Sequence, residues 1–187
     1  ALLDRITAAI PHRVTVARGQ EVGDAMNEIA NELKERSGDN ELAAKAPAVF
    51  LFILGQHKFK KLRNEDEFDF SMGDSDSTAS PGKQLAEVIT DGSSLGIHII
   101  TTFDSFNNVN RCMNRKALTE FEMRVVFQMS ANDSASLIDS PKASGLGLHR
   151  ALLHNEHEGS LETFRPYALP ETSWISETAA KLAARGG

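Results

Sequence analysis

Three short apolar runs, separated by segments with helical patterns, constrain the fold of this chain most strongly. They cover residues 47–54 (PAVFLFIL), 97–103 (IHIITTF) and 123–129 (MRVVFQM), and each has the length and β-branched or apolar content of a buried strand. Strands that alternate with helices are typical of βαβ units. Residues 150–154 and 160–165 predict an antiparallel hairpin. The expected fold class is therefore α/β, a mostly parallel sheet flanked by helices, with this hairpin at one edge.

The remaining segments are assigned from apolar spacing and turn residues. The clearest helix covers residues 19–36, where Val22, Met26, Ile29 and Leu33 recur at helical spacing. A short strand is expected at residues 12–17, because HRVTVA alternates. Residues 64–81 are polar and acidic and predict a flexible surface loop. Further helices are expected at residues 1–10, 83–93, 116–122, 134–138 and 171–185.

Composition limits the class of protein. The 187 residues are enough for a single α/β domain, and one cysteine, Cys112, excludes a disulfide framework and favours a reducing compartment, so we expect a cytoplasmic protein. No apolar run approaches the roughly 20 residues that span a bilayer, and any membrane attachment of a parent protein would come from a segment outside this chain. The net charge of −6 argues against a surface that coats nucleic acid. Because the chain begins without Met and ends in Gly186-Gly187, we expect a C-terminal fragment of a larger protein.

One stretch carries a resemblance to a known family. From Gly96 onward the order is GIH, an apolar strand, a polar loop, Arg124, a second strand, Asp133-Ser134 and then LID. This order, within residues 46–167, resembles the motor domain of FtsK/SpoIIIE-type DNA translocases, which are ring-forming ATPases with a RecA-like core. The resemblance implies the C-terminal part of a RecA-like domain of the P-loop NTPase type. The parent would couple ATP hydrolysis, with Mg²⁺, to translocation of duplex DNA in cell division or chromosome segregation.

The resemblance also implies partners. They are the upstream ATPase half of the same protein, further copies in a homo-oligomeric ring, and duplex DNA bound through the assembly. This chain would supply sheet, subunit interface and a candidate trans arginine. It would bind no cofactor and hydrolyse no ATP alone.

Two nucleotide-site motifs are absent or degenerate. A P-loop has the pattern G-x-x-x-x-G-K-(S/T), but Gly82-Lys83 is followed by Gln84 and is read as the start of a helix. The strand at residues 47–54 should end in an acidic pair that holds Mg²⁺. Gly55, Gln56 and His57 follow it instead. Gln56 could still position a water molecule, although a neutral amide does not replace a carboxylate on Mg²⁺.

After the strand at residues 97–103, the resemblance places Thr102 and Asp104 beside the γ-phosphate. Asp104 stands where the translocases usually have Gln, and its charge would repel a phosphate. The alternative is that Asp104 and Ser105 cap the next turn.

Arg124 matches an arginine of the family that resembles an arginine finger, reaching the nucleotide of a neighbouring subunit. The alternative is a structural arginine at the strand end, paired with Glu120 or Glu122. The matching Asp133-Ser134 is interpreted as part of a helix cap.

Basic residues form the remaining candidates. A cluster that includes Phe59 and Leu62 could contact DNA or a partner's acidic face, or could be a solvated amphipathic turn. The loop arginines are candidates for a subunit interface. We expect no metal site, although His149, His154 and His157 lie near the hairpin. The candidate interface or DNA residues are Lys58, Lys60, Lys61, Arg63, Arg111 and Arg115.

A second function fits the same sequence. The missing acidic pair favours a degenerate ATPase-like module that hydrolyses nothing and serves protein interaction or regulation, as in domains that resemble type VII secretion ATPases.

Overall fold

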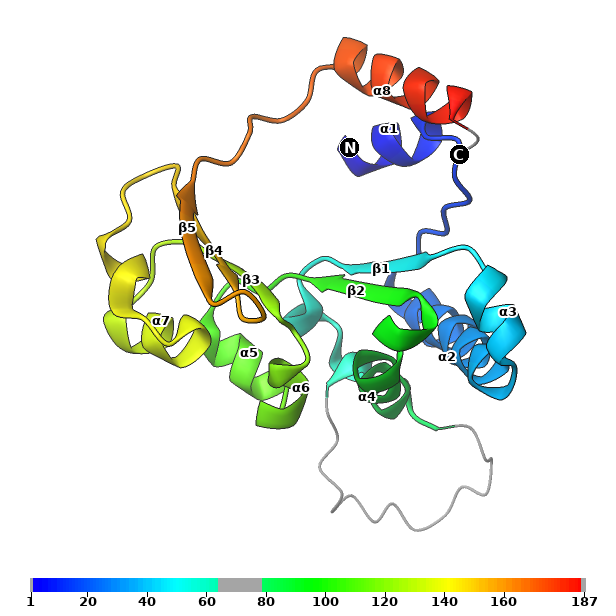
Figure 1. Ribbon diagram of the computed structural model, residues 1–187, viewed down its shortest axis with the longest axis horizontal. Helices are drawn as coiled ribbons and strands as arrows, with labels where there is room; N and C mark the ends of the chain where they lie inside the picture. Colours follow the sequence, from blue (N-terminus) through cyan, green and yellow to red (C-terminus); the bar gives the residue numbers. More distant parts are fainter. Residues whose placement is uncertain (1, 64–78, 186–187) are drawn as a thin grey trace. The chain divides into compact units, whose positions relative to one another are not determined.

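The computed structural model describes residues 2–63 and 79–185 (Figure 1). The chain divides into two compact units, one formed by Ala1–Val16 with Arg165–Gly187 and the other by Ala17–Phe164. Residues 64–78, most of the predicted acidic loop at 64–81, lie outside the described residues, and Pro81 already begins a helix.

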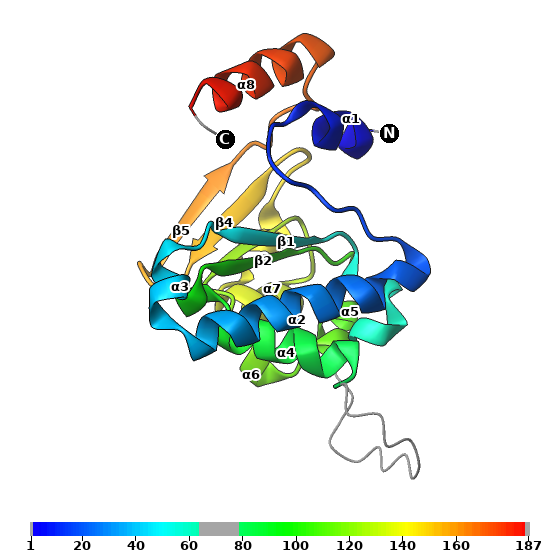
Figure 2. The same ribbon diagram turned by 90° about the vertical axis from the view of Figure 1, so that its right-hand side faces the viewer.

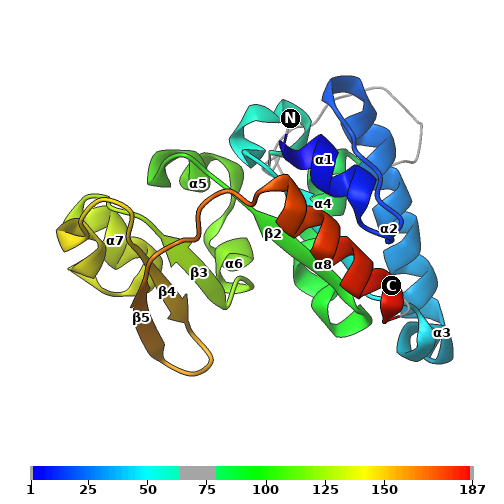
Figure 3. The ribbon, with the colours of Figure 1, turned by 90° about the horizontal axis from the view of Figure 1, so that it is seen from above.

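The smaller unit is a pair of helices that come from the two ends of the chain. Helix α1 (Leu2–Ala9) contacts helix α8 (Thr172–Ala184), beside which it lies in Figures 1 and 3. The guanidinium of Arg5 donates a hydrogen bond to the Thr172 hydroxyl. The strand predicted at residues 12–17 is wrong, since these residues have no regular structure. A strand needs a neighbouring strand to pair its backbone N–H and C=O groups. Among the described residues, none pairs with this segment.

The larger unit contains a two-stranded parallel sheet. Strand β1 (Val49–Ile53) pairs with β2 (Ile97–Thr101), with Val49 opposite Ile97 and Ile53 opposite Thr101. Helices α2 (Val22–Gly38) and α4 (Pro81–Asp91) pack on one face of this sheet. Both helices carry apolar residues at helical spacing, and these residues form the face that is buried against the sheet. The core formed here comprises Val22, Met26, Leu33, Ile53, Leu62, Leu85, Val88 and Ile97.

A separate antiparallel sheet lies in the same unit. Its order is β3 (Met123–Val126), β4 (Ala151–Asn155) and β5 (Ser160–Phe164), so the predicted hairpin is confirmed as β4–β5. Helix α7 (Ala131–Ile138) and helix α5 (Phe106–Cys112) contribute to the second core. The buried residues of that core are Val109, Val126, Leu137, Ile138, Ala143, Leu146 and Leu152.

Short helices connect these parts. Asp39 caps α3 (Asn40–Lys45), and Asn114 caps α6 (Arg115–Thr119) by accepting the Ala117 N–H at 2.8 Å. The 3₁₀ turns are η1 (Gly19–Glu21), η2 (Gln56–Lys58), η3 (Lys60–Leu62), η4 (Ser93–Leu95) and η5 (Pro141–Gly145).

The α/β class is confirmed, whereas the single, mostly parallel sheet is not what forms. Among the described strands, only β1 and β2 are parallel, and β3 pairs with the hairpin instead of extending their sheet. The physical reason is that β3 finds its backbone partners in β4, while β2 keeps an edge that no described strand occupies. None of the helices in residues 2–63 and 79–185 is long and apolar enough to cross a membrane.

Within the described part of the larger unit, the two helices that pack on the parallel sheet lie on one of its faces. In Figures 1 and 2, α2 and α4 both lie on the same side of β1 and β2. On the opposite face Phe50 is 57% exposed, Phe52 60% and Ile100 45%, and the Phe50 ring lies 5.1 Å from the His98 ring. Parallel strands are normally covered on both faces, so this apolar surface is unusual.

Candidate functional site

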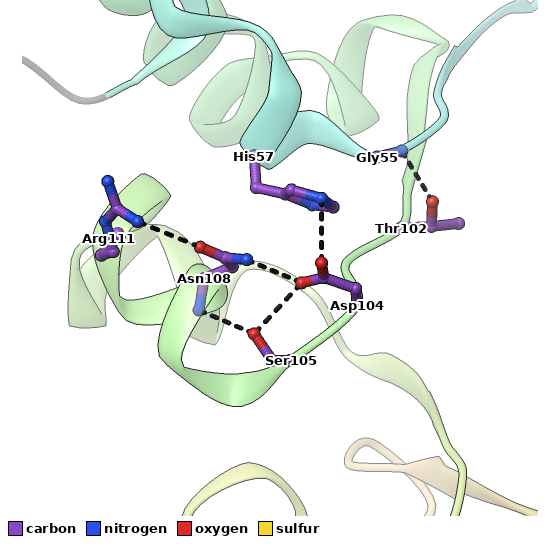
Figure 4. A network of polar contacts seen from close by, with 7 residues as sticks. All are labelled: Gly55, His57, Thr102, Asp104, Ser105, Asn108 and Arg111. Atoms are coloured by element: carbon purple, nitrogen blue, oxygen red, sulfur yellow. Dashed lines mark hydrogen bonds and ion pairs between the residues drawn. The ribbon is translucent and has the colours of Figure 1, made fainter.

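The carboxyl ends of β1 and β2 meet at one edge of the parallel sheet, which is where open α/β sheets bind ligands. The Gly55 N–H donates to the Thr102 hydroxyl at 2.8 Å (Figure 4). The Gln56 N–H donates to the Thr102 carbonyl at 3.1 Å. Gly55 has φ = 75°, a left-handed conformation that glycine adopts without strain. These contacts turn the chain after β1 directly into η2.

Gln56 is buried beneath this edge. Gln56 is only 1% exposed, and its Oε1 atom accepts a hydrogen bond of 2.9 Å from the Thr101 hydroxyl. Its Nε2 atom has no hydrogen-bond partner among the described residues. Gln56 borders a cavity of about 20 Å³, together with Leu85 and Cys112. The amide side chain of Gln56 is therefore packed between the strands and α4.

A polar network surrounds Asp104 (Figure 4). Its carboxylate accepts hydrogen bonds from Asn108 Nδ2 at 2.7 Å and the Ser105 hydroxyl at 3.1 Å, and lies 3.2 Å from His57 Nε2. The hydrogen bond from Asn108, followed by that from Ser105 and the charge of His57, lowers the pKa of Asp104 although partial desolvation opposes the shift. Arg111 Nη1 lies 3.5 Å from Asn108 Oδ1 and extends the network along α5.

The capping alternative is confirmed for Ser105. Its hydroxyl accepts the Asn108 N–H at 3.4 Å and begins α5, while Asp104 contacts the Asn108 side chain. Contact between Asp104 or Thr102 and a nucleotide stays a prediction. Asn108 was missed because no helix was expected over residues 106–112, where apolar periodicity is weak. The available signal was Ser105 followed three residues later by Asn108, a spacing typical of a helix start.

The basic residues near this edge are largely exposed. Lys58, Lys60 and Lys61 are exposed on η2 and η3, and η2 contacts α5, the helix that carries Arg111. Burial of the Cys112 thiol raises its pKa. The positive charges of Arg63 and Arg111 oppose this shift without cancelling it. The structure therefore brings Arg63 and Arg111 to the same place, around Cys112. Arg115 begins α6.

Arg124 lies in β3, outside the network around Asp104. Its guanidinium donates to the Leu137 carbonyl at 3.0 Å, the Leu118 carbonyl at 3.2 Å and Glu156 at 2.5 Å, and its side chain is 13% exposed. The predicted pairing with Glu120 or Glu122 is wrong, because the β3–β4 register places Arg124 next to the end of β4. A trans role for Arg124 stays a prediction.

The Asp133-Ser134 pair does not begin its helix. Ser130 is the cap of α7, accepting the Asp133 N–H at 3.1 Å. Ser134 is fully buried, donates to the Ser140 carbonyl at 2.5 Å and accepts the Ala143 N–H at 3.2 Å. It therefore fastens η5 to α7.

A metal ion has no evident ligand set in this part of the chain. Within residues 2–63 and 79–185, no group of three His, Cys, Asp or Glu side chains is placed to hold one. His57 and Asp104 form an acid–imidazole pair, which supplies two side chains and not the three or four that a zinc site needs.

Comparison with known proteins adds no relative. No protein-family model matches the chain, and a search of curated proteins found no match.

Proposed function

We propose that this chain is the C-terminal part of an FtsK/SpoIIIE-like ATPase domain, with a RecA-like fold once its sheet is complete. The parent protein couples ATP hydrolysis, with Mg²⁺, to movement of duplex DNA through a homo-oligomeric ring. This chain provides sheet, subunit interface and a candidate trans arginine, Arg124. Catalysis requires the upstream half of the domain.

The exposed apolar side chains on the parallel sheet are the observation that carries this proposal. Phe50, Phe52 and Ile100 expose an apolar surface on strands whose other face is packed against α2 and α4. Both β1 and β2 are also edge strands, because the described residues provide no third strand to this sheet. A parallel sheet with one bare face and two open edges is stable as part of a larger α/β domain. This supports an upstream half that completes the domain.

The state of Gln56 favours a second candidate, a degenerate ATPase-like module for protein interaction or regulation. Its amide lies just after the strand whose end carries an acidic pair in the family, at either Leu54-Gly55 or Gly55-Gln56. Gln56 is 1% exposed and bonds Thr101 instead of facing solvent. The nearby Asp104 is exposed and its lowered pKa keeps it charged, which opposes a phosphate at the same place. Both features weaken nucleotide hydrolysis at this edge.

ATP hydrolysis by a longer form of the protein, extended upstream of Ala1, separates the two candidates. The longer protein is measured with and without duplex DNA, and the present chain serves as the matched control that is expected to show background turnover only. Turnover that duplex DNA stimulates supports the motor. A background rate in both conditions overturns the motor and favours the interaction module.

A further inference from the structure

A basic segment follows strand β1. Residues 55–63, which form η2 and η3, contain four Lys or Arg side chains and no Asp or Glu. Lys58, Lys60 and Lys61 are exposed, and Arg63 is half-buried. None of the three lysines forms an ion pair with an acidic side chain of the described residues. Among those residues, the segment therefore presents positive charge that no neighbouring carboxylate neutralises.

A second basic segment follows strand β2. Residues 105–119, which include α5 and α6, contain Arg111, Arg115 and Lys116, all exposed, and again no Asp or Glu. Asp104, which precedes this segment, is already paired with an imidazole. The two segments hold seven of the 20 Lys and Arg residues of a chain whose net charge is −6. Positive charge is therefore concentrated in these two places.

The fold brings the two segments together. Leu62, Cys112 and Ala117 line one cavity of about 20 Å³, so η3, α5 and α6 surround the same point, and η2 contacts α5. The charges of Arg63 and Arg111 both lower the pKa of the Cys112 thiol, against the effect of its burial. In Figures 1 and 2, α5 and α6 lie on the same side of β1 and β2 as α4. The Lys and Arg side chains of residues 55–63 and 105–119 therefore form one surface, which we call the basic surface.

No large apolar side chain is exposed on the basic surface. This holds for all of residues 55–63 and 105–119, which the structure describes. Protein interfaces and membrane-bound segments use apolar or aromatic anchors, and single-stranded nucleic acid uses aromatic rings on which its bases stack. The backbone of a duplex needs only positive charge and hydrogen-bond donors, because its bases stay stacked inside the helix. The basic surface therefore fits a duplex best.

We infer that the basic surface binds the phosphate backbone of duplex DNA. The inference deepens the proposed function, on which it rests for DNA as the nucleic acid, and it assigns the contact to this chain itself. Binding is independent of sequence, because phosphate contacts do not read the bases. It is weak for one chain, because the net charge of −6 repels the duplex elsewhere on the molecule. A ring that presents several copies of the surface strengthens it.

Fluorescence anisotropy of a labelled duplex of about 20 base pairs tests the inference, with the present chain titrated at KCl concentrations from about 20 to 200 mM. The logarithm of the association constant should fall linearly with the logarithm of the salt concentration. Two double variants remove charge from the two segments, Lys60→Ala with Lys61→Ala and Arg115→Ala with Lys116→Ala. Each should weaken binding about 10-fold or more and make the salt slope shallower by about 1 to 2.

Lys34→Ala with Lys45→Ala is the charge-matched control, since both lysines are exposed, one on α2 and one on α3. Lys61 lies against Gly23, and Lys34 is eleven residues further along α2, about 16 Å away along the helix. This control should change the affinity by less than about 3-fold. Lys60→Arg with Lys61→Arg keeps the charge and should bind as the unmutated chain does. Circular dichroism checks that each variant is folded, and losses in both basic pairs no larger than that of the control would overturn the inference.

Other anionic partners are tested on the same variants. A single strand of equal length, poly-glutamate, or vesicles with about 30% phosphatidylserine serve as probes. Tighter binding of any of them than of the duplex, lost in the Lys60 and Lys61 double variant, would overturn the inference and assign the surface to that partner. In the longer protein, duplex-stimulated ATP hydrolysis that this variant leaves unchanged would overturn the inference and keep the motor. Duplex binding through the basic surface without ATP hydrolysis would support the inference and refute the motor alone.

Discussion

His57 Nε2 lies 3.2 Å from Asp104 Oδ2, and this ion pair joins the turn after β1 to the loop after β2. The two residues come from segments that follow neighbouring parallel strands, so their contact depends on the β1–β2 register. Asn108 and Ser105 hold the carboxylate from the other side. These contacts lie at the edge of the sheet where β1 and β2 end.

The first prediction concerns pH. Hydrogen bonds from Asn108 and Ser105 and the charge of His57 lower the pKa of Asp104 in the folded chain. A lowered folded-state pKa adds stability that is present above the unfolded value of about 4 and is lost as pH falls through the folded value. Asp104→Asn should therefore lower the thermal midpoint at pH 7. The two midpoints should converge as the pH falls below about 4.

Thermal unfolding followed by circular dichroism at intervals from pH 7 to pH 3 checks this. Asp91→Asn, a change to an exposed aspartate at the end of α4, is the control and should shift the midpoint little. A difference between wild type and Asp104→Asn that stays constant across the whole range would show that the charge of Asp104 contributes nothing.

The second prediction concerns Arg36, which is 1% exposed at the end of α2. Its guanidinium donates to the carbonyls of Leu95 and Pro47 and to Glu32, each at 2.8 Å. It therefore links α2 to the segments that enter β1 and β2. Arg36→Met leaves two carbonyls without their donor, and should lower the free energy of unfolding by about 3 kcal/mol.

Urea unfolding measures that loss. Lys34→Met makes the same substitution on an exposed position of the same helix, and is expected to change the free energy by less than about 0.5 kcal/mol. Equal midpoints for the two variants would mean that the hydrogen bonds of Arg36 do not stabilise the fold.

The third prediction concerns Gly82, the second residue of α4. A Cβ atom at this position would lie far inside the contact distance of the Arg63 carbonyl oxygen. The close approach of α4 to the end of η3 therefore requires glycine, in keeping with the helix-start interpretation of Gly82-Lys83. Gly82→Ala should cost about 1–3 kcal/mol through steric overlap. Gly38→Ala, at a helix end with open space around it, is the control, and a loss no larger than that of Gly38→Ala in urea unfolding would contradict the close approach.

Local sequence patterns predicted the individual helices and strands better than the way in which they pair and pack. Val22, Met26 and Leu33 recur at helical spacing and are buried in α2, because one apolar face is enough to specify that helix. The partner of β3 was not predictable from its own residues, because strand pairing joins distant segments and either sheet could accept an apolar edge strand. Ser105 and Asn108 escaped prediction because α5 depends on a cap and on packing against η2 more than on periodicity.

The partner of Arg124 illustrates the same limit at a single side chain. Nearby Glu120 and Glu122 were the natural candidates from sequence, yet the ion pair forms with Glu156, 32 residues away. The β3–β4 register decides this, since Arg124 lies opposite His154 and the chain passes Glu156 just beyond the strand. The spacing of charged residues along the sequence does not contain that register, so it could not identify Glu156 as the partner.

The last prediction separates a structural Arg124 from a trans arginine finger. The guanidinium bonds Leu118, Leu137 and Glu156 within the chain, so Arg124→Ala should lower the free energy of unfolding by about 2–4 kcal/mol. Glu156→Gln breaks the same ion pair but keeps the arginine, and serves as the matched control. If Arg124 is a finger, Arg124→Lys should lower ATP turnover of the longer protein by about 10³-fold or more, at a temperature where it stays folded. Glu156→Gln should leave turnover unchanged there, and an equal loss of turnover in both variants would leave Arg124 a structural role only.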